Sequence, residues 1–172
     1  MNDRLQTLLD KQDIYELICL YMRGLDRQDE TLLLSTFFED AWCDYGFTKG
    51  PAAGFVQFCM DALRDHAANQ HMVGNVLIDV TGDEAFGEVY FQAYHKMKTD
   101  SGFNDVTIAG RYLDRYLRRD GVWKFAYRSE VVDWSRTEPT QDPYFDLVPD
   151  GLRGGRQFDL LYRRDNRYAP EV

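Results

Sequence analysis

Asp26 is an acidic residue on the apolar face of the first predicted helix, residues 11–26. The apolar positions of this segment recur every three or four residues, as in an amphipathic helix; they are Ile14, Leu17, Ile18, Tyr21, Met22 and Leu25. Asp26 follows Met22 by four residues and continues this face. Because carboxylates are rarely buried without a partner, its position indicates a functional group such as a base in an apolar pocket. The alternative is that the helix has already ended and Asp26 is solvated in the next turn.

The chain has three histidines, and two of them lie on predicted strand faces. His71 opens the first long predicted strand, and His95 shares an apolar face of the second with Phe91 and Ala93. A single histidine on an apolar face is either a satisfied core residue or a functional group, and the pattern leaves both open. His66, near the end of the third predicted helix, is expected at the surface.

Acid–base chemistry is the mechanism that the motifs of the sequence leave available. No pair of histidines has the HxxxH or HExxH spacing of a zinc site and no cysteine accompanies them, so no metal is expected. There is also no nucleophile elbow, phosphate-binding loop or dinucleotide fingerprint. Nothing in the sequence therefore supplies an activated nucleophile or a cofactor site.

The periodicity of apolar residues, which predicts the elements that must position these groups, changes from helical to alternating near residue 70. Helices are predicted over 11–26, over a second segment capped by Asp29 that carries Leu32, Leu33, Phe37 and Phe38, and over a third whose first turn contains Pro51. A short strand is predicted over 41–47. Alternating patterns then predict four long strands, near 70–80, 85–99, 105–118 and 122–134, separated by glycine-containing turns. Helices followed by an antiparallel meander predict an α+β fold, in which three helices close the concave side of a curved sheet.

Composition bounds the remaining possibilities. The 172 residues suit one domain, 44% are hydrophobic, and the net charge of −9 argues against nucleic acid and anionic membrane surfaces as partners. Residues 1–9 are polar and do not resemble a secretory signal. The cysteines Cys19, Cys43 and Cys59 form no metal or redox motif, and Cys19 and Cys59 are expected as buried thiols in helices. A cytoplasmic location is expected.

Residues 137–172 form a predicted C-terminal extension to a domain of residues 1–136. The extension is too apolar for a disordered tag, since it contains Tyr144, Phe145, Leu147, Leu152, Phe158, Leu160, Leu161 and Tyr162. It is expected to pack on the domain, as a cover for the pocket, or on a neighbouring subunit.

The order of these features resembles the SnoaL-like family of the nuclear-transport-factor-2 superfamily, over residues 10–135. The segments that carry the resemblance are IYEL (14–17), YMRGLD (21–26), FEDA (38–41), DYG (44–46), QHM (70–72) with Asn75, GRYLD (110–114), DGVWK (120–124) and VDW (132–134). Members include scytalone dehydratase, bile-acid 7α-dehydratase, hexachlorocyclohexane dehydrochlorinase and SnoaL-type polyketide cyclases. The resemblance implies a cone-shaped barrel in which helices close a curved sheet.

The resemblance also implies roles for named residues. In the dehydratase and dehydrochlorinase relatives an aspartate late in the first helix holds a histidine on the sheet, which removes a proton next to a leaving group; Asp26 and His71 match these positions. Tyr21 and Tyr45 resemble tyrosines that polarise a carbonyl or assist the leaving group, with core packing as their alternative. His95 resembles a second pocket histidine. Arg128 lies near the place of a pocket arginine, with a surface arginine as its alternative.

Together these features predict a cofactor-independent lyase or isomerase that acts on a small hydrophobic, ring-bearing substrate. Two alternatives share the fold: a non-catalytic binding protein, and an accessory subunit resembling the β subunit of ring-hydroxylating dioxygenases. The long convex sheet face and the apolar extension both need covering, which predicts a homodimer or homotrimer.

Overall fold

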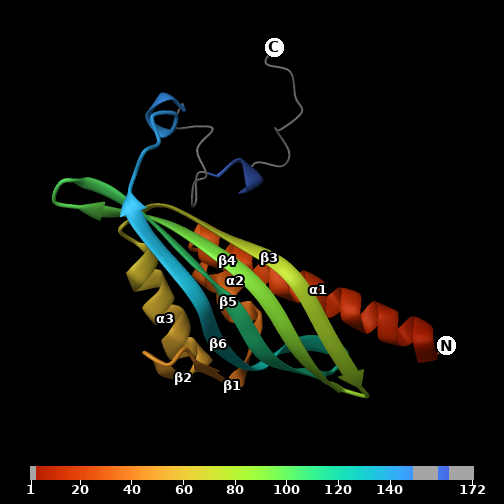
Figure 1. Cartoon of the computed structure of the whole chain (residues 1–172). Coiled ribbons are helices and arrows are strands. Elements are labelled where there is room, and N and C mark those ends of the chain that lie inside the picture. The colour runs from red at the N-terminus through yellow and green to blue at the C-terminus, as the bar shows by residue number, and fades with distance from the viewer. Residues whose placement is uncertain (1–2, 149–158, 163–172) are drawn as a thin grey trace, which may run out of the picture.

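Helices cover one face of a six-stranded sheet (Figure 1). The computed structural model describes residues 3–148 and 159–162. The chain begins with α1 (Asp3–Arg27), α2 (Glu30–Ser35), β1 (Phe37–Asp44), β2 (Lys49–Pro51) and α3 (Ala52–Leu63). The long strands follow as β3 (His66–Thr81), β4 (Glu84–Thr99), β5 (Gly102–Arg119) and β6 (Val122–Pro139). Two short 3₁₀ turns, η1 (Phe145–Leu147) and η3 (Leu160–Tyr162), complete the described elements.

The sheet has the order β2-β1-β6-β5-β4-β3. The β1–β6 pair is parallel and the other four pairs are antiparallel. Register shifts interrupt β3–β4 between Val73 and Val76, and β5–β6 next to Gly110. Such bulges bend a strand and increase its twist, so the sheet curves around the helices. The predicted α+β fold, with three helices on a curved, mostly antiparallel sheet, is confirmed.

Gly110 is required by this curvature. A Cβ at residue 110 would overlap the carbonyl oxygen of Val131 on β6, where the two strands approach at the register shift. The glycine therefore permits the bulge that bends the centre of the sheet.

The core lies between α1, α3 and the concave sheet face. The apolar stripe of α1 is buried as predicted, with Ile14, Ile18 and Tyr21 fully inaccessible. α3 contributes Phe55, Val56, Cys59, Met60 and Leu63 to the same cluster. Burial of this apolar area, at roughly 25 cal/mol per Å², is the main favourable contribution to the fold.

The second helix is shorter than predicted. Phe37 and Phe38 open β1 instead of continuing α2. The reason is tertiary: Phe37 pairs with Phe125 of β6, and the Phe125 amide donates to the Thr36 carbonyl. The Phe37 ring packs 5.2 Å from Phe125 and 5.8 Å from Tyr21, between centroids. These partners are distant in sequence and favour the strand over the helix.

Two side-chain placements also differ from prediction. His66 opens β3 and is half-buried, instead of lying at the surface at the end of α3. Cys19 is exposed, because it lies one residue beyond the buried Ile18 and therefore off the apolar stripe of α1. Cys59 is buried, as predicted.

The described parts of the C-terminal extension contact the domain. β6 continues past the predicted boundary at residue 136, to Pro139. The buried Lys96 then meets Asp142, 3.6 Å from Nζ to the carboxylate, and the Phe145 ring, 4.7 Å from Nζ. Farther on, Arg27 and Asp159 form a 2.7 Å ion pair. Tyr144 and Leu147 remain exposed, and Leu152 and Phe158 lie outside the described residues.

Among the described residues, no helix is long and apolar enough to cross a membrane.

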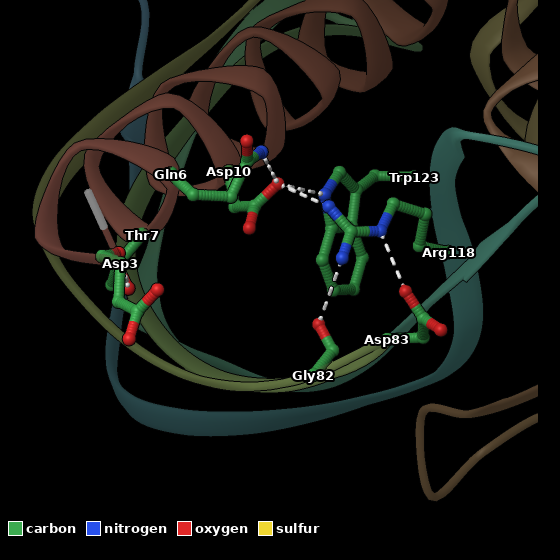
Figure 2. Close-up of polar contacts among 8 residues, drawn as sticks. All are labelled: Asp3, Gln6, Thr7, Asp10, Gly82, Asp83, Arg118 and Trp123. Carbon is green, nitrogen blue, oxygen red and sulfur yellow. Dashed lines mark hydrogen bonds and ion pairs between the residues drawn. The ribbon is translucent and has the colours of Figure 1, made fainter. Parts of the chain in front are cut away.

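A buried carboxylate ties the N-terminal half of α1 to the sheet (Figure 2). Asp10 is 3% exposed, and its Oδ1 accepts from Arg118 Nη1 at 2.6 Å and from Trp123 Nε1 at 3.1 Å. Gln6, one helical turn earlier, donates to the same oxygen at 3.1 Å. Arg118 also donates to Asp83 at 2.7 Å, on the exposed turn between β3 and β4.

This network gives a matched pair of stability predictions. Asp10→Ala leaves the Trp123 donor buried and unpaired, so we expect it to lower the free energy of unfolding by ~2–4 kcal/mol. The Asp83 side chain is 74% exposed, so Asp83→Ala, which removes the other carboxylate partner of Arg118, should cost less than ~1 kcal/mol. Urea unfolding of both variants measures the difference; equal losses would contradict it.

Candidate active site

The Asp26 carboxylate joins the end of α1 to β3. β3 is an edge strand, paired with β4 on one side only. The His71 amide donates to both Asp26 oxygens, at 3.0 and 3.1 Å, and the Asn69 side-chain amide donates to Oδ1 at 3.1 Å. His71 Nδ1 lies 2.8 Å from the same Oδ1. The side chains of His71 and Asp26 are 7% and 13% exposed, so the pair is shielded from water.

This contact determines the tautomer of neutral His71. An ionised carboxylate only accepts hydrogen bonds, so Nδ1 carries the proton in the bond to Asp26. In the neutral ring Nε2 then has a free lone pair and can take a proton. The resulting imidazolium would be stabilised by the carboxylate on its other side.

The three histidines of the chain lie in a row. The His95 ring contacts His71 at 5.3 Å and His66 at 5.0 Å, between centroids, both edge to face. His95 is 9% exposed, and its Nδ1 has no hydrogen-bond partner among the described residues. Burial, reinforced by the two neighbouring histidines, lowers the pKa of His95 from 6.5 to about 3. His95 is therefore a neutral ring at physiological pH.

Tyr21 and Tyr45 form a hydrogen bond with each other in the core. Their hydroxyl oxygens are 2.7 Å apart, and burial raises the pKa of both phenols. Tyr45 stacks on Phe55 at 4.2 Å between centroids. One hydroxyl proton is used between the two tyrosines, so the pair has a single further proton to donate.

Arg128 is fully buried, not at the surface. It donates to both oxygens of Asp114, at 2.8 and 2.7 Å, and this carboxylate also accepts from Tyr116 at 2.7 Å. The guanidinium carbon lies 4.1–4.2 Å from the ring centroids of Tyr21, Tyr112 and Phe125. Arg128 Nη1 has no hydrogen-bond partner among the described residues. These contacts hold the Tyr21 ring in one orientation, with the guanidinium against its face.

The sequence-derived residues thus form two groups. Asp26, His71 and His95 lie together at the β3–β4 side, whereas Tyr21, Tyr45 and Arg128 lie together in the core. Aromatic rings connect them: Tyr112 lies 6.1 Å from both Tyr21 and Tyr45 and stacks on Phe91 of β4 at 4.3 Å, between centroids.

Sequence reasoning missed two acidic residues near Arg128. Asp114 pairs with it, and Glu130 follows it by two residues on β6, opposite the buried Tyr112. Burial raises the pKa of Glu130 to about 7, although Arg128 opposes this shift. Alternation could not reveal Glu130, because the register shift between Phe125 and Tyr127 is what brings Arg128 and Glu130 to the inward face that begins with Trp123 and Phe125.

A groove of about 440 Å³ opens beside Asp26 and His71. α1 contributes Arg23 and Arg27 to its lining, and the C-terminal extension contributes Asp159 and Leu161. No group of three or more candidate metal ligands occurs in the portion of the chain described.

Comparisons with known proteins agree with this architecture. The profile of the SnoaL-like domain matches residues 6–129. The chain belongs to the SnoaL-like domain family. No functionally curated protein matches the sequence significantly.

Solved structures of similar fold include enzymes named for elimination reactions. A hexachlorocyclohexane dehydrochlorinase, LinA type 2, is 21% identical with a TM-score of 0.72, over 87% of this chain and 99% of that one. A protein from Novosphingobium aromaticivorans DSM 12444 named after scytalone dehydratase is 22% identical with a TM-score of 0.71, over 82% and 94%. LinA type 3 from Novosphingobium barchaimii LL02 is 22% identical with a TM-score of 0.70, over 78% and 94%. At these identities the likeness shows the fold of this SnoaL-like protein.

The neutral state of His95 predicts a specific pH dependence of stability. Its pKa in the folded protein is about 3, below the ordinary 6.5, so the unfolded chain binds more protons between these values. Stability linked to His95 is therefore complete above pH 6.5 and is lost as the pH falls. We expect His95→Gln to flatten this dependence, by up to ~1.4 kcal/mol per pH unit. Urea unfolding at pH 7.5, 5.5 and 4.5 measures it; parallel curves for wild type and variant would exclude a buried neutral ring.

Proposed function

We propose that this SnoaL-like protein is a cofactor-independent lyase, a dehydratase or a related elimination or isomerisation enzyme, acting on a small, hydrophobic and cyclic substrate. The observation that carries the proposal is the 2.8 Å contact between His71 Nδ1 and Asp26. It leaves Nε2 as the basic nitrogen of a shielded ring. Dehydratases and dehydrochlorinases among proteins of this fold support a lyase.

In the proposed reaction His71 acts as the general base. Nε2 removes a proton from a carbon next to the leaving group, and the electron pair of the C–H bond forms a double bond as the leaving group departs. Asp26 holds the ring in the required tautomer and stabilises the imidazolium. A positioned base of this kind contributes ~10²–10⁴-fold to the rate.

The remaining candidate residues are proposed to bind the substrate. The unpartnered Nδ1 of His95 offers a hydrogen bond next to His71. The Tyr21–Tyr45 pair has one spare hydroxyl proton for a carbonyl or a leaving group. Arg128 is proposed to act together with Tyr21, because its guanidinium carbon lies 4.1 Å from the centroid of the Tyr21 ring.

We further propose that residues 137–172 form an extension that covers the site. Two ion pairs support this proposal, Lys96–Asp142 and Arg27–Asp159. Asp159 and Leu161 line the groove beside Asp26, and the Tyr162 hydroxyl donates to Asp29 at 3.0 Å.

The Asp26–His71 unit is tested by kinetics of single and double variants. We expect His71→Ala and Asp26→Asn each to lower turnover by ~10²–10⁴-fold, with the double variant no worse than either, because the residues act together. Asn69→Ala is the matched control: it removes one hydrogen bond to Asp26 but keeps the bond to the His71 ring. Substrates are found by screening small cyclic alcohols, ketones and halides for elimination. Wild-type turnover in both single variants would leave a binding protein as the function.

We also propose a homo-oligomer formed through the convex sheet face. Leu77, Phe86 and Leu113 point outward from β3, β4 and β5 and are 63%, 56% and 40% exposed. An apolar surface of this kind on adjacent strands is the usual mark of a protein interface.

Light scattering tests this assembly. Wild type should give a mass of a dimer or trimer of the 20.1 kDa chain, and Leu113→Glu should give the monomer with unchanged far-ultraviolet circular dichroism. Glu138→Lys, an exposed change near the end of β6, serves as the control and should keep the oligomer. A monomeric wild type at micromolar concentration would refute the proposal.

A further inference from the structure

The groove of about 440 Å³ beside Asp26 and His71 is lined by two arginines of α1, Arg23 and Arg27. These two residues are four positions apart, so they project from successive turns of one helix face, ~6 Å apart along the axis. Arg23 is exposed, and it makes no hydrogen bond or ion pair within the described part of the chain. The groove is therefore a locally cationic surface on a protein of net charge −9.

The acidic residue between the two arginines is engaged elsewhere. Both oxygens of Asp26 accept from the amide of His71, and Oδ1 also accepts from the Asn69 side chain and contacts the His71 ring. The acceptor sites of this carboxylate are thus directed at β3. Arg23 is left to an acceptor that enters the groove.

Arg27 already holds one carboxylate in this groove. Asp159 of the C-terminal extension accepts from Arg27 Nη1 at 2.7 Å through Oδ2, and the two side chains are only 18% and 17% exposed. The other oxygen of Asp159 accepts from the Leu161 amide at 2.8 Å. A charge-assisted hydrogen bond of this kind is strong, and the guanidinium matches the geometry of a carboxylate. The protein itself therefore shows which chemical group fits beside Arg27.

Other walls of the groove are apolar. Met22 on α1, Met72 and Val73 on β3, and Leu161 on η3 border it. The volume of the groove lies within the range of small-molecule sites. A molecule with an apolar ring and a carboxylate would place the ring against these side chains and the carboxylate at the arginines.

We propose that this groove binds a hydrophobic carboxylic acid through Arg23 and Arg27, and that Asp159 occupies Arg27 until the acid displaces it. The extension then acts as a competitor within the chain, because its carboxylate and that of the ligand need the same guanidinium. Arg23 supplies the ligand with a second cation. Since Asp26 and His71 line the same groove, the acid is assigned as the substrate of the proposed lyase. This assignment rests on the proposed function, whereas the binding site does not.

Calorimetry with cyclohexanecarboxylate and with its uncharged analogue cyclohexanecarboxamide tests the binding site. At pH 7.5 wild type should bind the carboxylate at least about tenfold more tightly than the amide. Arg27→Gln and Arg23→Gln should each weaken binding of the carboxylate, by about tenfold for Arg27. Arg64→Gln, which changes an exposed arginine outside the groove, is the control and should have no effect. Equal affinities for the two probes, or no binding of the carboxylate to wild type and to Asp159→Asn, would overturn the proposal.

Asp159→Asn tests the competition. Asparagine keeps the oxygen that accepts from Leu161 but removes the charge that pairs with Arg27. This variant should bind cyclohexanecarboxylate at least about fivefold more tightly than wild type, because a larger fraction of the protein is competent to bind. The gain should disappear in the Arg27→Gln background, since both changes act on one contact. An affinity that stays the same or falls in Asp159→Asn would refute the competition.

The thiol of Cys19 shows where the probe binds. Cys19 lines the groove and is exposed, whereas Cys43 and Cys59, the other two cysteines of the chain, are buried. N-ethylmaleimide should therefore label Cys19 first, and Cys19→Ser should lack the fast-labelled thiol. Saturating cyclohexanecarboxylate should slow this labelling. An unchanged labelling rate with the carboxylate bound would place the probe elsewhere and contradict the proposed site.

Turnover separates this inference from the proposed function. With a carboxylate substrate, Arg27→Gln should raise KM by about tenfold and leave kcat nearly unchanged, because Arg27 binds the substrate and does not take part in proton transfer. If His71→Ala abolishes turnover and Arg27→Gln changes neither constant, the lyase stands and the substrate assignment fails. If wild type has no lyase activity but the binding, competition and protection results hold, the carboxylate site stands without the lyase.

Discussion

The contact between Asp26 and β3 is the constraint on which the site depends. An edge strand has unpaired amide groups, and β3 has a partner strand on one side only. Asp26 satisfies the amide of His71 and holds its ring with the same carboxylate. The backbone of β3, the end of α1 and the tautomer of the candidate base are thus coupled through one side chain. A shift of α1 by about an ångström would therefore change the orientation of the His71 ring as well as the packing of the helix.

The polar side chains of the concave interior differ in whether they have a partner of opposite charge. Two arginines are paired with buried carboxylates: Arg118 with Asp10, which connects the end of β5 to α1, and Arg128 with Asp114, which joins β6 to β5. Buried ion pairs add little net stability, but removing one partner is costly, so they favour a single arrangement of the core. His95 and Glu130 differ from them, since neither has a counterion that matches it. Burial keeps His95 neutral at pH 7 and raises the pKa of Glu130 to about 7, so that its carboxyl is partly protonated there.

The sequence predicted more of the fold than of the site. The apolar stripe of α1 and the alternating strands are local patterns, and both predicted the elements that the structure has. The end of α2 was wrong because Phe37 is fixed by Phe125, a contact between residues almost ninety positions apart. Asp26 stood out because a carboxylate on an apolar face is unusual, and His71 came from family resemblance. Glu130 was missed because its importance depends on the register with Tyr112 and on a neighbour, Arg128, whose charge is already used; neither is visible in a strand pattern.

Holding two such groups neutral has a cost that depends on pH in opposite ways. His95 lowers stability as the pH falls below 6.5, because the histidine of the unfolded chain binds a proton while the buried ring stays unprotonated. Glu130 lowers it as the pH rises from 4.5 to about 7, because in this range the unfolded carboxyl ionises while the folded one keeps its proton. Near neutral pH an uncharged imidazole and a partly protonated carboxyl therefore coexist in the folded protein. An interior selected only for stability would replace both with apolar residues, as buried ion pairs can be replaced. The presence of both groups in one interior supports the proposal of proton transfer at this site over packing alone.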